Sequence, residues 1–423
     1  MSVGQATPAG SRMRPEPFGP ARRVVVMKFG GTSVGDPARI RHVAARLVAA
    51  RDDGSQVVGV ISAMGRTTDD LISLAAQVSR HPDPRELDML LTVGERVACA
   101  LVAMVINDLG REAISLTGSQ AGIVTDTVHG KAKIVEIRAR RIRQALDRGQ
   151  IVLVAGFQGI STEFDLTTLG RGGTDTTAVA LAAALRATEC EIYTDVEGVF
   201  TADPRLVQNA RKLHAVSYDE MLELAAAGAT VLQLRSVELA RNTRVKIHVR
   251  SAFDAKPGTW VTEEDERMLE QAIISGVTQT TEEAVYHVQG VRPAELFEAL
   301  AAQHVNVDTI IQTSTDVIVF SAPRDDRRTT ATVLDRLGAS FAERDDLGKV
   351  SVVGAGMKSH PGLAAATFTT LRSLGVEPQF ISTSPIKIAF YVHHDEVKAV
   401  VGALHETFDL GLPGAERPDE GGS

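Results

Sequence analysis

Two short segments of the sequence combine glycines with charged residues whose types suit the binding of an anion. Lys28 precedes the glycine pair of KFGGTS, and Arg171 and Asp175 belong to the segment TLGRGGTDTTA. Glycines let backbone N–H groups approach a phosphate or carboxylate closely, while a lysine or arginine supplies the countercharge. Paired glycines after a strand are also typical of a tight turn, and an aspartate at a helix start is also typical of a cap. Each segment alone therefore leaves two interpretations open.

A third candidate lies within the apolar run LTVGERVACALVAMVINDLG, where Glu95 and Arg96 are adjacent. Burying either charge is costly without a partner, so we predict that at least one of them faces a site or an ion pair. A fourth candidate is YTDVEGVFTADPR, at 193–205, which is rich in Asp, Gly and Pro. Taken by itself, this fourth segment indicates only a connection with turns.

The elements that must position these residues alternate between strands and helices. Apolar, β-branched segments predict strands at 24–29, 57–64, 150–161 and 189–200, and amphipathic segments predict helices at 36–54, 69–80 and 91–110. Strands that are apolar throughout and separated by helices predict a mostly parallel sheet with helices on both faces. Such sheets bind ligands at the carboxyl ends of their strands, where all four candidates lie.

The pattern changes near residue 263, and shorter units follow. The segment AELFEALAAQHVNVDTIIQTSTDVIVF aligns with AATFTTLRSLGVEPQFISTSPIKIAFY further along the chain. This internal repeat predicts two ferredoxin-like βαββαβ modules, at 263–345 and 346–410. The segments 1–22 and 411–423 are rich in Gly, Pro and charged residues, and we expect both to be disordered tails.

Composition excludes several classes of function. The formal net charge of −8 argues against a protein that covers nucleic acid or an anionic membrane surface. The chain has only two cysteines, which is too few for a disulfide framework and favours a reducing compartment, the cytoplasm. No run reaches the apolar length that we expect of a membrane span. The motifs of serine hydrolases, zinc proteases and dinucleotide-binding dehydrogenases are missing from the sequence.

Taken together, the motifs resemble those of the aspartokinases, which are members of the amino acid kinase family. The resemblance rests on KFGGTS, SAMG, LLTVGER, GFQGIS, TLGRGGTDTTA and YTDVEGVFTADPR, and on GAGMKSHPG and ISTS in the repeated modules. It covers about residues 24–410 and implies an α/β fold, with an amino acid kinase domain at 23–262 followed by two regulatory ACT modules. It further implies phosphoryl transfer from Mg-ATP to the β-carboxylate of L-aspartate.

The resemblance also implies a role for individual residues. The catalytic residues are Lys28, which stabilises the transferring phosphoryl group, and Asp175, which orients Lys28. Substrate is expected at Ser62, Thr68, Glu95, Arg171, Gly172 and Gly173, with Glu95 on the ammonium group and Arg171 on the α-carboxylate. Nucleotide is expected at Lys28, Gly30, Gly31, Thr32, Ser33, Thr194, Asp195, Gly198, Phe200, Asp203 and Arg205. Regulatory contacts are expected at Gln312, Met357, His360, Pro361, Gly362, Ser382 and Thr383. Magnesium is expected on phosphate oxygens and water, with no protein ligand.

The sequence departs from the family pattern in two places. Thr230 stands where many members have a lysine that resembles a nucleotide contact, and Arg235 or Arg205 is a possible substitute. In the first module, YHVQGVRPAELF is shorter than the family's usual effector-binding loop, and Pro378 and Pro385 replace common polar residues in the second. We therefore predict that feedback inhibition by lysine or threonine is weakened or altered.

Two alternatives and several partners complete the prediction. The chain could instead be a kinase of the same fold acting on another small amino acid or carboxylate, or a noncatalytic amino acid sensor. L-aspartate and ATP are the expected small molecules, with lysine and threonine as possible effectors. We expect a homo-oligomer assembled through the ACT modules, with neither nucleic acid nor membrane as a partner. The downstream pathway, and any separate regulatory subunit from an internal start, stay undecided by the sequence.

Overall fold

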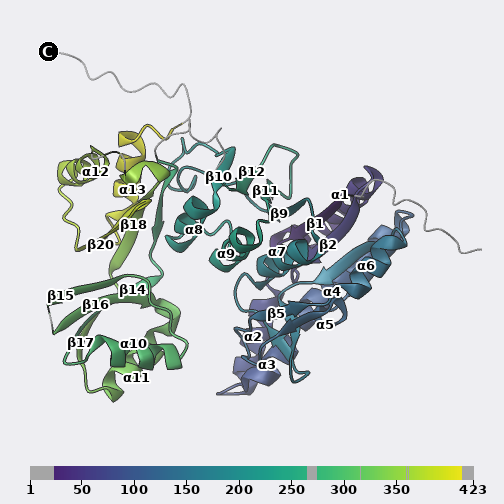
Figure 1. Ribbon diagram of the computed structural model, residues 1–423, viewed down its shortest axis with the longest axis horizontal. Coiled ribbons are helices and arrows are strands. Elements are labelled where there is room, and N and C mark those ends of the chain that lie inside the picture. The colour runs from purple at the N-terminus through teal and green to yellow at the C-terminus, as the bar shows by residue number, and fades with distance from the viewer. Residues whose placement is uncertain (1–22, 264–273, 315, 359, 361, 412–423) are drawn as a thin grey trace, which may run out of the picture.

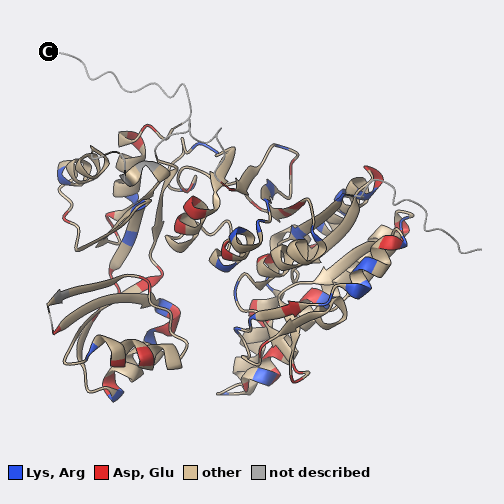
Figure 2. Cartoon of the chain, in the orientation of Figure 1, with Lys and Arg blue, Asp and Glu red and all other residues tan. Residues whose placement is uncertain are grey.

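The computed structural model describes residues 23–263, 274–314, 316–358, 360 and 362–411. The large N-terminal domain, which we call the kinase domain after the resemblance described above, lies on the right in Figure 1, and two smaller modules lie one above the other on the left. Positive and negative side chains are interspersed over both halves, as Figure 2 shows. The described chain therefore presents mixed charge on both halves.

The kinase domain is organised around one large sheet of eight strands in the order β10-β12-β11-β9-β1-β2-β6-β3. These strands are β1 (Val24–Phe29), β2 (Gln56–Ile61), β3 (Ala113–Leu116), β6 (Ile151–Ala155), β9 (Glu189–Thr194), β10 (Ala215–Ser217), β11 (Ile247–Ser251) and β12 (Thr259–Thr262). Every neighbouring pair is parallel except β11 with β12, which is antiparallel. The prediction of a mostly parallel sheet is confirmed.

Helices cover both faces of this sheet. One face is covered by α1 (Pro37–Asp52) and α4 (Val93–Asp108), and the other by α6 (Arg140–Asp147), α7 (Gly173–Leu185), α8 (Tyr218–Ala226) and α9 (Leu234–Thr243). Successive residues of a strand point to opposite faces, so Val25 packs in the core under α1 while Val26 packs in the core under α7. Because both faces are buried, the strands are apolar throughout.

A smaller four-stranded sheet, in the order β5-β4-β7-β8, lies within the kinase domain. It contains β4 (Ile123–Thr125), β5 (Ile134–Ile137), β7 (Gln158–Ser161) and β8 (Leu166–Thr168). The remaining short elements are η1 (Gly31–Val34), α2 (Thr67–Val78), α3 (Pro84–Leu91) and α5 (Gly118–Ala121). The sequence analysis did not anticipate this second sheet, because its strands are only three or four residues long.

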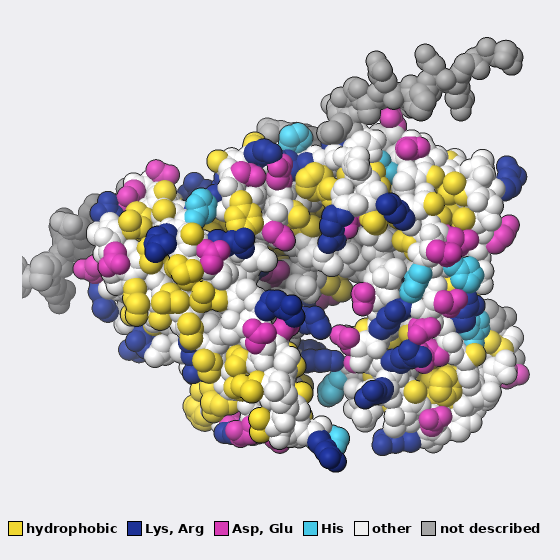
Figure 3. Space-filling model, turned by 180° about the vertical axis from the view of Figure 1, so that it is seen from behind, with side chains coloured by type: hydrophobic (Ala, Val, Ile, Leu, Met, Phe, Trp, Pro, Cys, Tyr) yellow, Lys and Arg dark blue, Asp and Glu magenta, His cyan; other side chains and the backbone are white. Residues whose placement is uncertain are grey.

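The helical run Pro84–Asp108 is 25 residues long and apolar enough, by length and composition, to cross a membrane. The sequence analysis expected no run of that kind, so this point is a correction. Half of its most apolar stretch is buried, and Cys99 and Val102 pack into the core beneath α1. Its outer face carries exposed apolar side chains such as Val97 and Met104, and Figure 3 shows apolar side chains gathered over this part of the protein. Burial against the sheet is typical of the core helix of a soluble protein.

Each of the two C-terminal modules has one four-stranded sheet and two α-helices. The first contains β14 (Glu283–Gln289), α10 (Pro293–Ala302), β15 (Ile310–Ser314), β16 (Val317–Pro323), η3 (Arg324–Asp326), α11 (Arg327–Arg336) and β17 (Ser340–Arg344). The second contains β18 (Leu347–Val353), η4 (Ala355–Lys358), α12 (Gly362–Ser373), β19 (Phe380–Ser384), β20 (Lys387–His393) and α13 (Val397–Thr407). The predicted ferredoxin-like fold of both modules is confirmed.

The second module obtains its fourth strand from a distant part of the sequence. Its sheet has the order β13-β18-β20-β19, and β13 (Gly276–Thr280) precedes the first module in the chain. The predicted division at 345 and 346 had placed these residues in the first module. The first module is thus inserted between two strands of the second module's sheet, an arrangement that a local repeat in the sequence does not reveal.

Candidate active site

The centre of the candidate site is an ion pair between β1 and α7. The Nζ atom of Lys28 lies 2.7 Å from Oδ1 of Asp175, and both side chains are largely buried. Lys28 is near the carboxyl end of β1, and Asp175 is in the first turn of α7. The N-terminal end of a helix favours a negative charge, so α7 supports the Asp175 carboxylate while the carboxylate holds the lysine in place. The two predicted catalytic residues are therefore in direct contact.

Glu95 reaches the same cavity from the first turn of α4. It is 3% exposed, and its Oε2 atom is buried with no hydrogen-bond partner among the described residues. Burial raises the pKa of Glu95 to about 7, although hydrogen bonds from its own backbone and from Ala63 act in the other direction. Its neighbour Arg96 instead donates to Thr92 and Gln158, which are structural contacts. Of this adjacent pair, only the glutamate lines the cavity.

The loop before α7 supplies Arg171 and its glycines. Gly172 has φ +68°, and a Cβ atom there would lie 1.8 Å from Cγ of Gln233, so only glycine fits. The Arg171 side chain is 91% exposed and lies 3.6 Å from Asp325 of the first C-terminal module. The guanidinium group is thus not confined by its own domain, and it can turn toward a ligand in the cavity.

These residues line one cavity of about 610 Å³ at the carboxyl ends of the parallel strands. The predicted residues that line it are Lys28, Gly31, Ser62, Thr68, Glu95, Arg171, Gly172, Gly173, Asp175 and Thr194. Phe157 also lines it and has φ +67°, a conformation that is strained for a side chain of this size. Strained residues cluster at functional sites, in agreement with this location.

A second cavity of about 290 Å³ shares Thr194, Thr230 and Val231 with the first. It is lined by six residues of the predicted nucleotide segment, namely Thr194, Asp195, Gly198, Phe200, Asp203 and Arg205. Arg205 forms a two-pronged pair with Asp203, with its Nη2 atom 2.7 Å from Oδ2, and this hydrogen bonding lowers the pKa of the carboxyl group. The two cavities therefore adjoin, with Lys28 in the lining of the first and the segment 194–205 in the lining of the second.

Family comparisons agree with this geometry. Residues 23–251 match the amino acid kinase family, and residues 350–408 match the ACT domain. The chain is 52% identical over 406 residues to an aspartokinase of Mycolicibacterium smegmatis, with 92% of this chain and 96% of the relative covered. It is 49% identical, with the same coverage, to an aspartokinase of Corynebacterium glutamicum. The chain belongs to the aspartokinase family.

Solved aspartokinase structures have the same fold. A structure of E. coli aspartokinase III in complex with aspartate and ADP has a TM-score of 0.81 to this chain, at 24% sequence identity. The similarity covers 91% of this chain and 99% of the chain in that structure. A structure of aspartate kinase from Synechocystis has a TM-score of 0.53 to this chain, at 37% sequence identity. That similarity covers 93% of this chain and 70% of the chain in that structure. The first of these similarities establishes the fold alone.

Three residues of the predicted phosphate channel lie outside both cavities. Gly30 does not line the larger cavity, although a Cβ atom at Gly30 would lie 3.5 Å from Nζ of Lys28. Thr32 is exposed, and Ser33 is buried beside a separate small cavity near Phe253. The cause is η1, a 3-10 helix that turns the chain away immediately after Gly31. The side chains of Thr32 and Ser33 therefore line neither cavity, and their contact with nucleotide stays a prediction.

The structure also bears on Thr230, which stands where many aspartokinases have a lysine. Thr230 lines both cavities, so a lysine at this position would reach the junction between them. Arg235 does not replace it, because its guanidinium group donates to the backbone oxygens of Leu169 and Ala132. Arg205 lines the second cavity and is the better substitute.

One residue that lines the larger cavity was not anticipated from the sequence. Asp88 on α3 is only 1% exposed and lines the larger cavity. It accepts hydrogen bonds from Thr168 and from the Gly130 backbone, and it pairs with Nδ1 of His129. It thereby fixes the segments that precede the Arg171 loop. The available signal was an acidic residue within the otherwise apolar face of LDMLLTVG.

The predicted regulatory residues are divided between the two C-terminal modules. Pro361 lies outside the described residues. The others are Gln312 on β15, Met357 in η4, His360 just before α12, Gly362 at the start of α12, and Ser382 and Thr383 on β19. β15 and β19 are edge strands of different sheets. The two sheets are nevertheless in contact, because Ile311 of β15 and Phe380 of β19 pack against one hydrophobic cluster.

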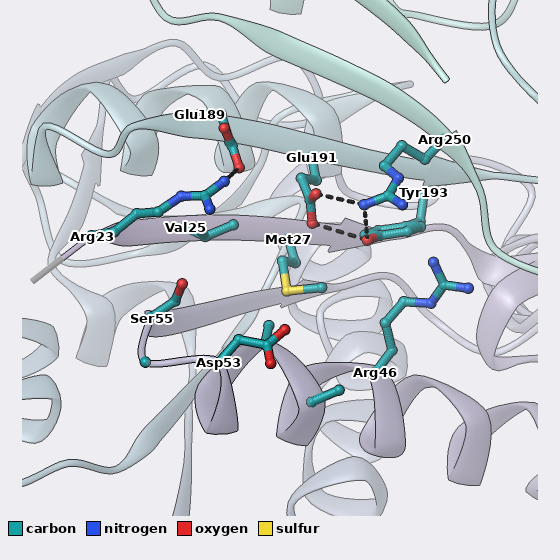
Figure 4. A pocket seen from close by; sticks show the side chains of 13 residues that line it. Arg23, Val25, Met27, Arg46, Asp53, Ser55, Glu189, Glu191, Tyr193 and Arg250 are labelled. Atoms are coloured by element: carbon teal, nitrogen blue, oxygen red, sulfur yellow. Dashed lines mark hydrogen bonds and ion pairs between the residues drawn. The ribbon is translucent and has the colours of Figure 1, made fainter. Parts of the chain in front are cut away.

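A further cavity of about 400 Å³, which we call the α1-side cavity, lies between α1 and the strands β1 and β9 (Figure 4). Two of its carboxylates, Glu189 and Glu191, are paired with other residues of the cavity. Glu191 accepts from the Tyr193 hydroxyl group and from Arg250, each at 2.9 Å, and Glu189 pairs with Arg23. Burial raises the pKa of Tyr193 to about 12, so its hydroxyl group remains a donor. None of the predicted catalytic residues lines this cavity.

Proposed function

We propose that this protein transfers the γ-phosphoryl group of ATP to the β-carboxylate of L-aspartate and forms 4-phospho-L-aspartate. The observation that carries the proposal is the buried Lys28–Asp175 pair, which lines the same cavity as Glu95 and Arg171. A second cavity, lined by the segment 194–205, adjoins this one. Membership of the aspartokinase family supports the choice of substrate.

The reaction needs charge stabilisation more than it needs proton transfer. A carboxylate is already ionised at neutral pH, so the nucleophile requires no general base. The chain must bring two anions together and stabilise the charge of the transferring group. Lys28 carries out this stabilisation, and Asp175 is a positioning residue that aims the lysine into the cavity.

Substrate recognition follows from the groups that are left free. The unpartnered Oε2 of Glu95 accepts a hydrogen bond from the substrate ammonium group. Arg171 turns from the protein surface and binds the α-carboxylate with two parallel hydrogen bonds. Gly172 and Gly173 leave room for this approach, while Ser62 and Thr68 close the cavity on the substrate side.

The nucleotide occupies the second cavity, with its phosphates directed toward Lys28. Mg²⁺ would be held by the phosphate oxygens and water, because this ion gives up its hydration shell reluctantly. When bound, the ion neutralises charge on the β- and γ-phosphates. Arg205 exchanges its partner Asp203 for a phosphate oxygen.

A substrate panel tests this function. Purified protein is given Mg-ATP with L-aspartate, L-glutamate, N-acetyl-L-glutamate or carbamate, and the acyl phosphate is trapped with hydroxylamine. We expect L-aspartate to have the highest kcat/KM. A preference for another acceptor would favour a different kinase of this fold, and no turnover with any acceptor would favour an amino acid sensor.

We further propose that feedback regulation is altered. The connection between β14 and α10 consists of Gly290, Val291 and Arg292 only, and it offers little room for an effector. Activity measured with millimolar lysine, threonine or both should fall only weakly. Strong cooperative inhibition by the pair would contradict this proposal.

The setting of the activity is also a proposal. We place the protein in the cytoplasm as a homo-oligomer assembled through the ACT modules, where it would supply the pathway to lysine, threonine or methionine, or to a specialised product. The free thiols of Cys99 and Cys190, both buried, are consistent with a reducing compartment. Light scattering coupled to size-exclusion chromatography measures the oligomeric state directly.

A further inference from the structure

The wall of the nucleotide cavity is built from both halves of the molecule. Besides the segment 194–205 and α8, the cavity is lined by Val277, Thr278 and Gln279 of β13. These residues belong to the sheet of the second C-terminal module, because β13 pairs with β18. A regulatory module therefore contributes side chains to the cavity in which we place ATP.

The contact between β13 and the kinase domain is close. Gly228 has φ +113°, and a Cβ atom there would lie 2.0 Å from the backbone oxygen of Gln279. The Val277 N–H group donates to the Thr201 oxygen at 2.8 Å. The nucleotide segment and the second module also share one hydrophobic core, in which Ala202 and Val207 pack with residues of β18 and α13. This contact fixes the position of the Gln279 side chain relative to the cavity.

Gln279 has unused hydrogen-bonding capacity at this position. Its Oε1 atom is buried and has no hydrogen-bond partner among the described residues. A buried amide oxygen without a donor is unfavourable, and native proteins rarely leave one unsatisfied. The cavity wall around it includes Val199, Leu224 and Val277. An aliphatic wall beside one free amide is the environment that a nucleobase requires, with apolar contact to its faces and a hydrogen bond to its edge.

We propose that Gln279 recognises the base of the nucleotide, which makes it a specificity-determining residue contributed by the regulatory half. The inference rests on the proposed function, which places ATP in this cavity. Oε1 accepts a hydrogen bond from the 6-amino group of adenine, and the Nε2 amide can donate to N1 of the ring. Nucleotide binding is thereby coupled to the strand pair β13 and β18.

The experiment compares ADP with purine riboside diphosphate, an analogue that lacks the 6-amino group. Calorimetry without aspartate measures the affinity of both ligands for the native protein, for Gln279→Met and for the control Gln289→Met, which changes an exposed glutamine on β14. We expect the native protein and the control to prefer ADP by about 3- to 10-fold. Gln279→Met should bind both ligands with equal affinity.

Several outcomes would overturn this inference. One is that the native protein binds the two ligands with equal affinity. Another is that Gln279→Met loses the same factor of affinity for both ligands, and a third is that ADP does not bind at all. The first needs no variant and is independent of whether Gln279→Met folds. If ADP is preferred as expected but aspartate is not phosphorylated, the proposed function fails while the role of Gln279 stands. Hydrogen exchange adds a readout, because ADP should slow exchange at β18 amides in the native protein more than in Gln279→Met.

Discussion

The cavity of about 610 Å³ that Lys28 lines, which we propose as the catalytic cavity, and the α1-side cavity contain similar residues but differ in what those residues leave free. Both are lined by β1 and β9, and both contain buried carboxylates beside basic groups. In the α1-side cavity, both oxygens of Glu191 are already bonded, to Arg250 and Tyr193. In the catalytic cavity, Glu95 retains a free oxygen and Arg171 projects into solvent.

This difference separates a binding site from a structural network. Charges that satisfy each other stabilise the fold, whereas charges with remaining capacity can act on a ligand. Changes in the catalytic cavity should therefore reduce activity and change stability little. Changes in the α1-side cavity should do the opposite. The four predictions below test this contrast.

The largest expected effect is the loss of Lys28. Lys28→Met removes the cation that faces the transferring phosphoryl group, so kcat should fall by about 10³-fold. Steady-state kinetics at saturating ATP and aspartate measure this fall, and thermal unfolding checks the fold. Lys256→Met, at a lysine paired with Glu197 on the surface, is the matched control and should keep native activity. Retention of activity by Lys28→Met would remove the basis for the catalytic assignment.

The second effect concerns the stability of the α1-side cavity. Glu191→Gln breaks a partly buried pair and leaves Arg250 without its carboxylate, so the free energy of unfolding should fall by about 1–3 kcal/mol. Urea denaturation gives this value. The kcat/KM for aspartate should stay within about twofold of the native value, because none of the predicted catalytic residues lines this cavity. A large loss of activity in a folded variant would place a functional site in this cavity.

The third effect is a pH dependence set by Glu95. Its pKa of about 7 lies above the ordinary carboxyl value, so the group takes up a proton as the pH falls through 7. A protonated Glu95 cannot pair with the substrate ammonium group, and KM for aspartate should rise by about tenfold per pH unit below that point. Glu95→Gln should have a higher KM that no longer changes between pH 6 and pH 8. A native KM that is constant over this range would contradict the assigned role.

The smallest effect is expected at the contact between the catalytic cavity and the first module. Arg171 and Asp325 are both exposed and 3.6 Å apart, and pairs of this kind contribute little. Asp325→Asn should lower KM for aspartate by about twofold or less, because it frees Arg171, and added salt should remove the difference. Asp335→Asn, on the same module, is the control. A tenfold change would mean that the first module controls substrate binding directly.

The sequence predicted which residues lie together at the centre of the candidate site, because those residues follow local rules. Lys28 and Thr194 lie at the carboxyl ends of neighbouring strands, and Asp175 starts the helix that packs on them. Any chain with this order of strands and helices brings these positions together.

The failures of prediction have physical causes beyond the reach of local patterns. Ser33 misses the cavity because a 3-10 helix begins at Gly31, and no spacing rule distinguishes that turn from a direct entry into α1. Arg235 was a plausible substitute for the missing lysine, yet two backbone oxygens bind it. Gln279 gave no signal, because its strand pairs with β18 across the whole first module.

The position of β13 in the chain limits how the protein can be divided. A fragment that began at the first module, after residue 281, would leave β18 without its neighbour and expose an apolar strand edge, a known route to aggregation. A soluble regulatory fragment should therefore start upstream of Gly276. The same reasoning applies to a kinase fragment, which would lose the Val277 partner of Thr201 if it ended at residue 262. Expression boundaries for this protein should overlap at β13, with that strand kept in both pieces.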